Sequence, residues 1–295
     1  ALPPYRKPIP MEHVHDRIGD TTLRCDPDKI VAVVRTHGPD RNSPFTPIDA
    51  TSERIAGHLI EFLKHEVALG RLPPNLLPLQ SGVGNIPNAV LAGLAKSGFH
   101  GLTAFTEVIQ DGMLDLLREG VLDVASCTGF ALSPEANETF KRDIAFYRER
   151  IIMRTQEMSN HPELVRRLGC IGMNGMIEAD LYGNVNSTHV MGSRIQNGIG
   201  GSGDFARNGF MSVFLSPSTA KGGSISALVP MVSHVDHTEH DVSVIVTEQG
   251  LADLRGLTPK QRAHTLIANC VHPDYSDALQ DYFDRALHHS YGKHT

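Results

Sequence analysis

The chain has 295 residues, 40% of them hydrophobic, with 27 basic and 33 acidic side chains and a formal net charge of -6. That length allows about two domains or one large α/β domain, and the composition is that of a globular protein with a sizeable core, which excludes disordered and fibrous classes. A net negative chain has no global field that attracts nucleic acid or an anionic membrane, so we expect neither as a partner.

Membrane-spanning, secreted and cysteine-based metal classes are also disfavoured. No apolar run reaches the roughly 18–20 residues needed to cross a bilayer, and the proline-rich N-terminus lacks the apolar stretch of a signal peptide. The cysteines lie far apart without a C-x-x-C pair, which predicts reduced thiols rather than a zinc ribbon or a redox dithiol. They are Cys25, Cys127, Cys170 and Cys270. We therefore expect a soluble protein of a reducing compartment.

The first part of the chain does not look like a domain. A short β-branched run at residues 30–34 (IVAVV) predicts a buried strand, and residues 38–47, with three prolines and a glycine, predict a linker. Residues 1–47 show no helix pattern and are too short to be a domain. We interpret them as the tail of an absent N-terminal domain plus a linker, followed by a second domain over residues 48–295.

The second domain has an α/β pattern. It begins with a helix that Thr51 is expected to cap, with apolar residues at helical spacing up to Gly70. Strand-like and helix-like runs then alternate, which predicts a mainly parallel sheet flanked by helices. The expected strands span residues 76–80, 102–106, 121–125, 150–154, 211–215 and 242–247. The expected helices span residues 88–96, 113–119, 135–148, 162–168, 259–269 and 275–288.

A Gly-x-Gly turn follows the first of these strands, in residues 80–85 (QSGVGN). Such a turn exposes backbone N–H groups at the start of a helix, where they suit an anion or a carbonyl oxygen. A purely structural tight turn is the alternative. The candidate ligand-binding residues of the turn are Gln80, Ser81, Gly82, Gly84 and Asn85.

Two strands deliver the same dipeptide, Thr-Glu, to their carboxyl ends. Glu107 follows one of these strands and Glu248 follows the other. Open α/β sheets bind their ligands at this edge, so the two carboxylates could face one crevice. The alternative is that both only complement the dipoles of the helices that follow.

A glycine-rich loop, residues 197–205 (NGIGGSGDF), has four glycines between Gly198 and Gly203. So few side chains let a substrate reach the backbone, whose N–H groups can form an oxyanion hole. A dinucleotide-binding fingerprint is the competing interpretation. It fails because the preceding segment is a poor strand and no βαβ unit with an acidic residue about 20 positions on follows cleanly.

Residues 233–241 (SHVDHTEHD) carry three histidines at a spacing of three, with interleaved carboxylates. Three imidazoles and an open position would make a catalytic zinc site of His234, His237 and His240. That spacing needs a helix, which the stretch does not favour. We therefore expect a hydrogen-bonded loop and no metal, with a zinc hydrolase as the alternative.

Seven motifs in chain order resemble those of the acetyl-CoA hydrolase/transferase family and cover nearly the whole chain. They are residues 80–85 (QSGVGN), 106–108 (TEV), 159–163 (SNHPE), 182–189 (YGNVNSTH), 198–205 (GIGGSGDF), 233–237 (SHVDH) and 247–256 (TEQGLADLRG). The resemblance implies the C-terminal part of a class I CoA-transferase, with a fold like that of ribose-5-phosphate isomerase. It also implies a homodimer that needs its own N-terminal domain, in the cytoplasm or, in a eukaryote, the mitochondrion.

The resemblance further implies the roles of the site residues. Glu107 would be the nucleophile, which attacks an acyl-CoA thioester and then carries CoA as a covalent glutamyl-CoA thioester. Gly201, beside Gly200, would donate an N–H group to the oxyanion of each acyl transfer. Asn160 would help to hold the carboxylate substrate.

Two more residues and the cofactor expectation follow from the same resemblance. Glu248 would be a second active-site carboxylate that positions Glu107 or tunes its ionisation by like-charge proximity. Arg41 would lie near the CoA site, and the turn at residues 80–85 would contact substrate or CoA. Coenzyme A would be a substrate, with no tightly bound cofactor.

The implied reaction moves CoA between a succinyl-, propionyl- or acetyl-CoA and a small carboxylate such as acetate or succinate. Water could intercept the covalent intermediates, so an acetyl-CoA hydrolase is the first alternative. A non-enzymatic acyl-CoA or sugar-phosphate sensor is the second alternative. A sensor would not need a strand-end glutamate beside a glycine-rich loop.

Overall fold

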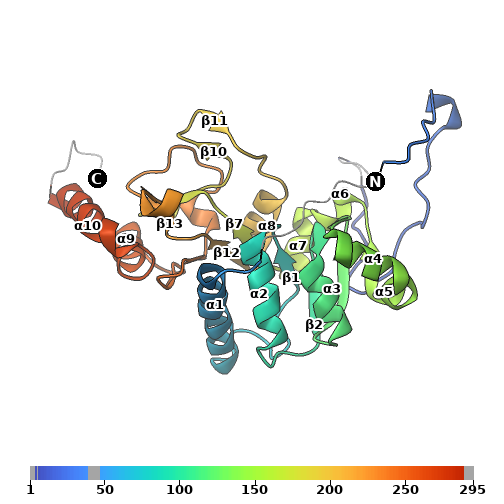
Figure 1. Ribbon diagram of the computed structural model, residues 1–295, viewed down its shortest axis with the longest axis horizontal. Coiled ribbons are helices and arrows are strands. Elements are labelled where there is room, and N and C mark those ends of the chain that lie inside the picture. The colour runs from blue at the N-terminus through green and yellow to red at the C-terminus, as the bar shows by residue number, and fades with distance from the viewer. Residues whose placement is uncertain (1–3, 5, 39–46, 289–295) are drawn as a thin grey trace.

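The computed structural model of the protein describes residues 4, 6–38 and 47–288 (Figure 1). Within these residues, eight strands form a central sheet in the order β17-β16-β12-β7-β1-β2-β4-β6. Neighbouring strands are parallel except β16 and β17, which are antiparallel. The mainly parallel α/β class is therefore confirmed. The strands are β1 Leu79–Ser81, β2 Leu102–Phe105, β4 Leu122–Cys127, β6 Ile151–Met153, β7 Ile171–Gly175, β12 Met211–Leu215, β16 Val244–Val246 and β17 Leu251–Asp253.

Short strands outside this sheet shape the loops at its edges. They are β3 Val108–Gln110 with β5 Gly129–Ala131, β8 Glu178–Asp180 with β9 Val185–Asn186 and β15 Leu228–Val229, β10 His189–Val190 with β11 Arg194–Ile195, and β13 Thr219–Ala220 with β14 Ile225–Ser226. Among the described residues, no helix is both long and apolar enough to span a membrane.

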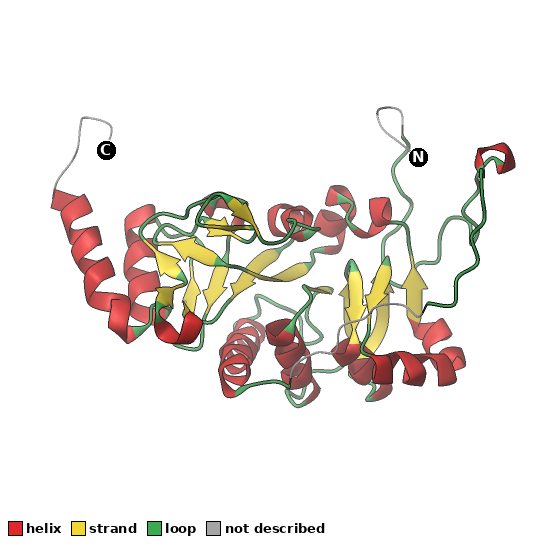
Figure 2. Ribbon diagram, turned by 45° about the horizontal axis from the view of Figure 1, so that its top comes forward, coloured by secondary structure: helices red, strands yellow, loops and turns green. Residues whose placement is uncertain are grey.

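Helices lie on both sides of the central sheet (Figure 2). The apolar faces of α1, α2 and α3 belong to the largest core cluster, whereas α9 and α10 pack in a second cluster. A third cluster joins α7 and α8 to the strands β2, β4 and β6. The α-helices are α1 Ala50–Ala68, α2 Asn85–Ala95, α3 Asp111–Arg118, α4 Pro134–Arg142, α5 Ile144–Arg150, α6 Gln156–Ser159, α7 Pro162–Leu168, α8 Ser202–Asn208, α9 Pro259–Asn269 and α10 Pro273–His288.

Local signals explain which predicted boundaries agree with the structure. The strand at 211–215 and the helices at 162–168 and 259–269 have the expected limits, and α9 starts at a capping box formed by Thr258 and Gln261. Thr51 as the cap of the first helix is wrong. The Asp49 carboxylate accepts the Ser52 N–H at 2.7 Å, so Asp49 is the N-cap and Thr51 lies inside α1.

The predicted buried strand at residues 30–34 is wrong. The structure has no strand there, and the side chains of Val31 and Val33 are 97% and 83% exposed. A β-branched run favours a strand only where another strand is available to pair with it, and none of the described residues supplies one. The linker predicted at residues 38–47 lies mostly outside the described residues.

The N-terminal segment nevertheless packs against the main body of the protein. Met11 and Val14 are buried in the third core cluster beside Phe105. The Arg154 guanidinium donates to the backbone carbonyls of Val14 at 3.0 Å and Asp16 at 2.6 Å. The assignment of residues 1–47 to the tail of another domain stays a prediction. A segment of this domain and the tail of a neighbouring domain could both make these contacts.

The central strand β7 was missed because its sequence, IGMNG, lacks the expected β-branched run. At Gly172 a Cβ would fit tightly, 3.3 Å from Gln80 Oε1 and 3.4 Å from the Phe205 Cβ. Its Asn174 exchanges hydrogen bonds of 3.0 and 3.1 Å with the Gln80 side chain of neighbouring β1. A polar pair buried between two central strands cannot be recognised from apolar periodicity.

Candidate active site

A cavity of about 520 Å³ opens at the carboxyl ends of the central strands β1, β2 and β7. Residues 80–83, 174–177 and 196–202 form most of its lining, together with Glu107, Val108 and Ser187. Two of the sequence motifs, the Gly-x-Gly turn and the glycine-rich loop, therefore meet the first strand-end glutamate in one cavity. This edge of a parallel sheet is where α/β proteins bind ligands.

Glu107 leaves the end of β2 with its side chain held on one oxygen. Its Oε2 atom accepts the Gly201 N–H at 3.1 Å and lies 3.3 Å from Asn160 Nδ2, which donates to it. Its backbone carbonyl accepts the N–H groups of Thr128 at 2.8 Å and Gly129 at 3.2 Å, which fixes the chain at this point. The carboxylate is therefore oriented from both its backbone and its side chain.

Gly201 has no room for a side chain. A Cβ would lie 2.2 Å from Asn160 Nδ2 and 2.5 Å from Glu107 Oε2, far inside contact distance. Neighbouring Gly200 has φ = 57°, a left-handed conformation that favours glycine. Gly201 is the N-cap of α8, and the N–H group expected to bind an oxyanion here binds the Glu107 carboxylate.

Asn160 contacts Glu107 but does not line the cavity. It is 8% exposed and follows α6, just before the start of α7. Its Nδ2 atom also lies 3.4 Å from Asp204 Oδ2, in the first turn of α8. Asp204 was not predicted from the sequence, although its place three residues after Gly201, as the first acid after the glycines, is a usable signal.

The Gly-x-Gly turn uses its glycine N–H groups inside the protein. The Gly82 N–H donates to Met173 O at 2.8 Å, and the Gly84 N–H donates to Gln110 Oε1 at 3.0 Å. Both N–H groups are therefore already bonded within the protein. This contradicts the expectation that the N–H groups of these two glycines bind an anion or a ligand carbonyl oxygen. Gln80, Ser81 and Gly82 line the cavity, whereas Gly84 and Asn85 begin helix α2 outside it.

Glu248 is held in a different environment. The Ser218 N–H donates to its Oε2 at 2.7 Å, the Ser218 hydroxyl donates to its Oε1, and Gln249 Nε2 donates to Oε1 at 3.0 Å. Burial acts to raise the pKa of Glu248, but these hydrogen bonds outweigh it and lower the pKa below its ordinary value.

The structure does not bring Glu248 and Glu107 together. Strand β16, which ends two residues before Glu248, lies four positions from β2 in the sheet, so the two strands are roughly 19 Å apart at the usual strand spacing. Glu248 is also absent from the cavity lining. The expectation of one shared crevice is therefore not met within the described residues. Arg41, the expected CoA-site arginine, lies outside them.

The three histidines of residues 233–241 go to separate environments. His234 contacts Asp236 at 3.3 Å, and His240 is exposed. His237 is buried against the Phe214 ring, with its Nε2 atom 3.2 Å from the Ser202 hydroxyl, and burial lowers its pKa. The stretch is the hydrogen-bonded loop that was expected. Across the described residues, these three histidines do not converge on a common point as zinc ligands would.

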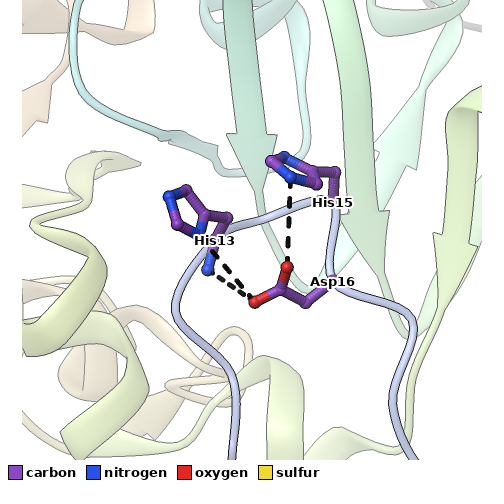
Figure 3. A group of neighbouring side chains, drawn as sticks. All are labelled: His13, His15 and Asp16. Carbon is purple, nitrogen blue, oxygen red and sulfur yellow. Dashed lines mark hydrogen bonds and ion pairs between the residues drawn. The ribbon is translucent and has the colours of Figure 1, made fainter.

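In the described part of the chain, the group whose side chains are close enough to share an ion is instead His13, His15 and Asp16 (Figure 3). Both imidazoles are largely exposed. The Asp16 carboxylate accepts the backbone N–H groups of His13 at 2.8 Å and Glu12 at 2.7 Å, and these bonds lower its pKa. The carboxylate therefore already serves as the hydrogen-bond acceptor of a surface turn.

Comparison with curated proteins supports the motif assignment. The chain is 56% identical to the succinyl-CoA:acetate CoA-transferase of Clostridium kluyveri over 290 residues, which are 98% of this chain and 54% of that protein. It is 51% identical to the acetyl-CoA hydrolase of Neurospora crassa over 289 residues, 97% of this chain and 55% of that protein. The chain thus spans about half the length of the curated relatives it matches.

Solved structures and a family model agree with this result. RipA from Yersinia pestis matches with a TM-score of 0.73 and 26% identity over 86% of this chain and 57% of that chain. A 4-hydroxybutyrate CoA-transferase from Porphyromonas gingivalis matches with a TM-score of 0.64 and 26% identity over 82% of this chain and 57% of that chain. Residues 139–283 match the model of the acetyl-CoA hydrolase/transferase C-terminal domain. The chain therefore belongs to the acetyl-CoA hydrolase/transferase family.

Proposed function

We propose that this chain carries the catalytic glutamate of a CoA-transferase, which exchanges CoA between a short acyl-CoA and a small carboxylate through a glutamyl-CoA thioester on Glu107. The observation that supports this most is the placement of Glu107. Its carboxylate lines the cavity and is fixed through Oε2 by the Gly201 N–H group at 3.1 Å and Asn160 Nδ2 at 3.3 Å. A carboxylate oriented in this way is suited to act as a nucleophile.

The reaction has four balanced steps. Glu107 Oε1 adds to the thioester carbonyl, the C–S bond breaks, and an acyl-glutamyl anhydride and CoA thiolate result. The thiolate then adds to the glutamyl carbonyl, and the first carboxylate leaves. The incoming carboxylate attacks the glutamyl-CoA thioester and releases the thiolate, which finally attacks the new acyl carbonyl and regenerates Glu107. No oxidant, reductant or net proton is needed.

The hydrogen bonds support different roles for the two Glu107 oxygens. Gly201 and Asn160 both donate to Oε2, which favours Oε1 as the oxygen that attacks. When the thiolate adds to the glutamyl carbonyl, the negative charge develops on Oε2, where these two donors already lie. Removing one such donor typically costs about 2.7–4 kcal/mol of transition-state stabilisation.

Hydrolysis is the second candidate, because a relative of 51% identity is named an acetyl-CoA hydrolase. The two activities share the anhydride and differ in whether water or a carboxylate takes the acyl or glutamyl group. A panel of succinyl-, propionyl- and acetyl-CoA, each with and without acetate or succinate, separates them. A transferase forms the new acyl-CoA with little free thiol, whereas a hydrolase releases thiol at the same rate without an acceptor.

We further propose that the active unit is longer than this chain. The chain spans 54% of the Clostridium kluyveri relative, so we expect an N-terminal domain to complete the crevice. We also propose that the full protein is a homodimer of the cytoplasm or mitochondrion. It would need no tightly bound cofactor. Residues 1–295 alone should then turn over poorly compared with the full-length protein. Equal turnover by the two would show that the crevice does not need the other domain.

A further inference from the structure

A second carboxylate, Asp204, lies close to Glu107 and is not used in the transfer steps. The Asn160 side-chain nitrogen joins the two, at 3.3 Å from Glu107 Oε2 and 3.4 Å from Asp204 Oδ2. Asp204 sits in the first turn of α8, and its backbone N–H donates to Gly201 O at 3.1 Å. One buried amide thus bridges the nucleophile and an acid anchored to the glycine-rich loop.

The orientation of the Asn160 amide depends on these acceptors. The two ends of an asparagine amide are nearly the same size, so hydrogen-bond partners decide which end faces which side. Among the described residues, Asn160 Oδ1 is buried without a hydrogen-bond partner, so nothing there holds the amide from its oxygen end. The NH2 group faces two carboxylate oxygens, and a turned amide would place its carbonyl oxygen against both.

We propose that Asp204 is a positioning residue, which holds the Asn160 amide with its NH2 group toward Glu107. The inference rests on the proposed function, because it takes Glu107 as the nucleophile. With the amide held, Glu107 Oε2 stays hydrogen-bonded and Oε1 is presented to the thioester. Without Asp204, one of the two acceptors that fix the amide is lost, and the turned amide withdraws a donor from the oxyanion.

Asp204 occupies a place that does not favour its ionised form. Burial raises its pKa, the hydrogen bond from Asn160 lowers it, and the charge of Glu107 raises it again. Perturbed carboxylates of this kind cluster at functional sites, which agrees with the contact that Asp204 makes to Asn160.

Steady-state kinetics of three variants of the full-length protein test the proposal. Asp204→Ala removes the acceptor, and we expect kcat to fall about 10- to 100-fold while KM for acyl-CoA changes less than about 3-fold. Asp204→Asn keeps an oxygen in the acceptor position, and we expect its kcat within about 5-fold of the wild type. Arg207→Ala is the matched control, because this side chain on the same helix is 76% exposed, and its kcat should be unchanged.

A double-mutant cycle with Asn160→Ala separates positioning from a general structural effect. If Asp204 acts through Asn160, adding Asp204→Ala to Asn160→Ala should lower kcat by less than about 2-fold further. A double variant that loses the product of the two single losses would overturn the proposal, and so would a normal kcat in Asp204→Ala. If Asp204→Ala does not fold, an Asp204→Asn variant as impaired as Asn160→Ala would overturn it as well.

Denaturing mass spectrometry of the wild-type protein incubated with an acyl-CoA, added to these kinetics, distinguishes this proposal from the function on which it rests. A wild-type protein that forms no glutamyl-CoA adduct on Glu107 contradicts the proposed function. A wild type with the adduct, together with independent effects at Asp204 and Asn160, contradicts the positioning role alone.

Discussion

Glu107 and Glu248 have the same sequence context, but their carboxylates have different surroundings and hydrogen-bond partners. Each follows a threonine at the carboxyl end of a parallel strand of the same sheet. Glu107 opens onto the cavity and is held on one oxygen, whereas both oxygens of Glu248 accept hydrogen bonds from Ser218 and Gln249. In both cases the end of a strand positions the carboxylate. The hydrogen bonds donated by the facing loop then determine whether a carboxylate oxygen remains available to react.

The largest contrast is expected from removing each carboxylate in the full-length protein. Glu107→Ala should lower CoA exchange by more than about 1000-fold, because the covalent route has no other nucleophile. Glu248→Ala should lower it by no more than about 10-fold and leave CoA binding intact, because its contacts lie outside the cavity. Steady-state exchange rates check both changes, and equal losses would show that the two glutamates act in one site.

A smaller but still large effect is expected at the loop opposite Glu107. Gly201→Ala should lower turnover about 100- to 1000-fold, because the new Cβ displaces the Glu107 carboxylate and the Asn160 amide from the donor position. Gly57→Ala is the matched control, since this glycine of α1 does not line the cavity and a Cβ there has nothing within 4 Å. Turnover and thermal unfolding of both variants decide the point, and equal turnover in the two would remove the steric argument.

A third carboxylate, Glu66, provides a contrast to Glu107 and Glu248, because its role is to stabilise the fold. It is buried in α1 against Arg71 and Arg255, whose hydrogen bonds lower its pKa from 4.5 to about 2 despite its burial. The side chain contributes stability that is complete above about pH 4.5 and is lost as the pH falls toward 2.

Glu66→Gln should therefore lower the free energy of unfolding by about 1–3 kcal/mol at neutral pH and leave kcat unchanged. The loss relative to the wild type should shrink as the pH falls below about 4.5. Denaturant unfolding at several pH values measures it, and a constant difference at all these pH values would argue against the ion pair as its cause.

The sheet class, the glycine-rich loop and the place of Glu107 at a strand end could be predicted from the sequence because these depend on local patterns. Apolar strands with β-branched residues and proline-started helices such as α7 and α9 are visible one segment at a time. Strand β7 could not be recognised from apolar patterns, because its Asn174 pairs with Gln80 in the interior. Val31 was predicted to be buried, but its side chain is exposed. Both outcomes depend on partners far away in the sequence.

The same limit applies to the site. The family resemblance implied that Glu107 and Gly201 share a site, but the separation of Glu248 depends on the strand order β2-β1-β7-β12-β16, which no single motif encodes. Asp204 was missed because its neighbour in space, Asn160, is 44 residues away in the chain. Tertiary contacts between loops decide which chemically capable residues work together.

Denaturing mass spectrometry of the full-length protein, incubated with an acyl-CoA and no acceptor, tests the central claim most directly. The acyl carboxylate can diffuse away while CoA stays attached, so we expect an added mass of CoA less one water on the peptide that contains residues 104–112. Borohydride should reduce the activated Glu107 side chain to an alcohol, and Glu107→Ala should form no adduct. An adduct on Glu248, Ser81 or a cysteine, or CoA exchange by Glu107→Ala, would contradict Glu107 as the nucleophile.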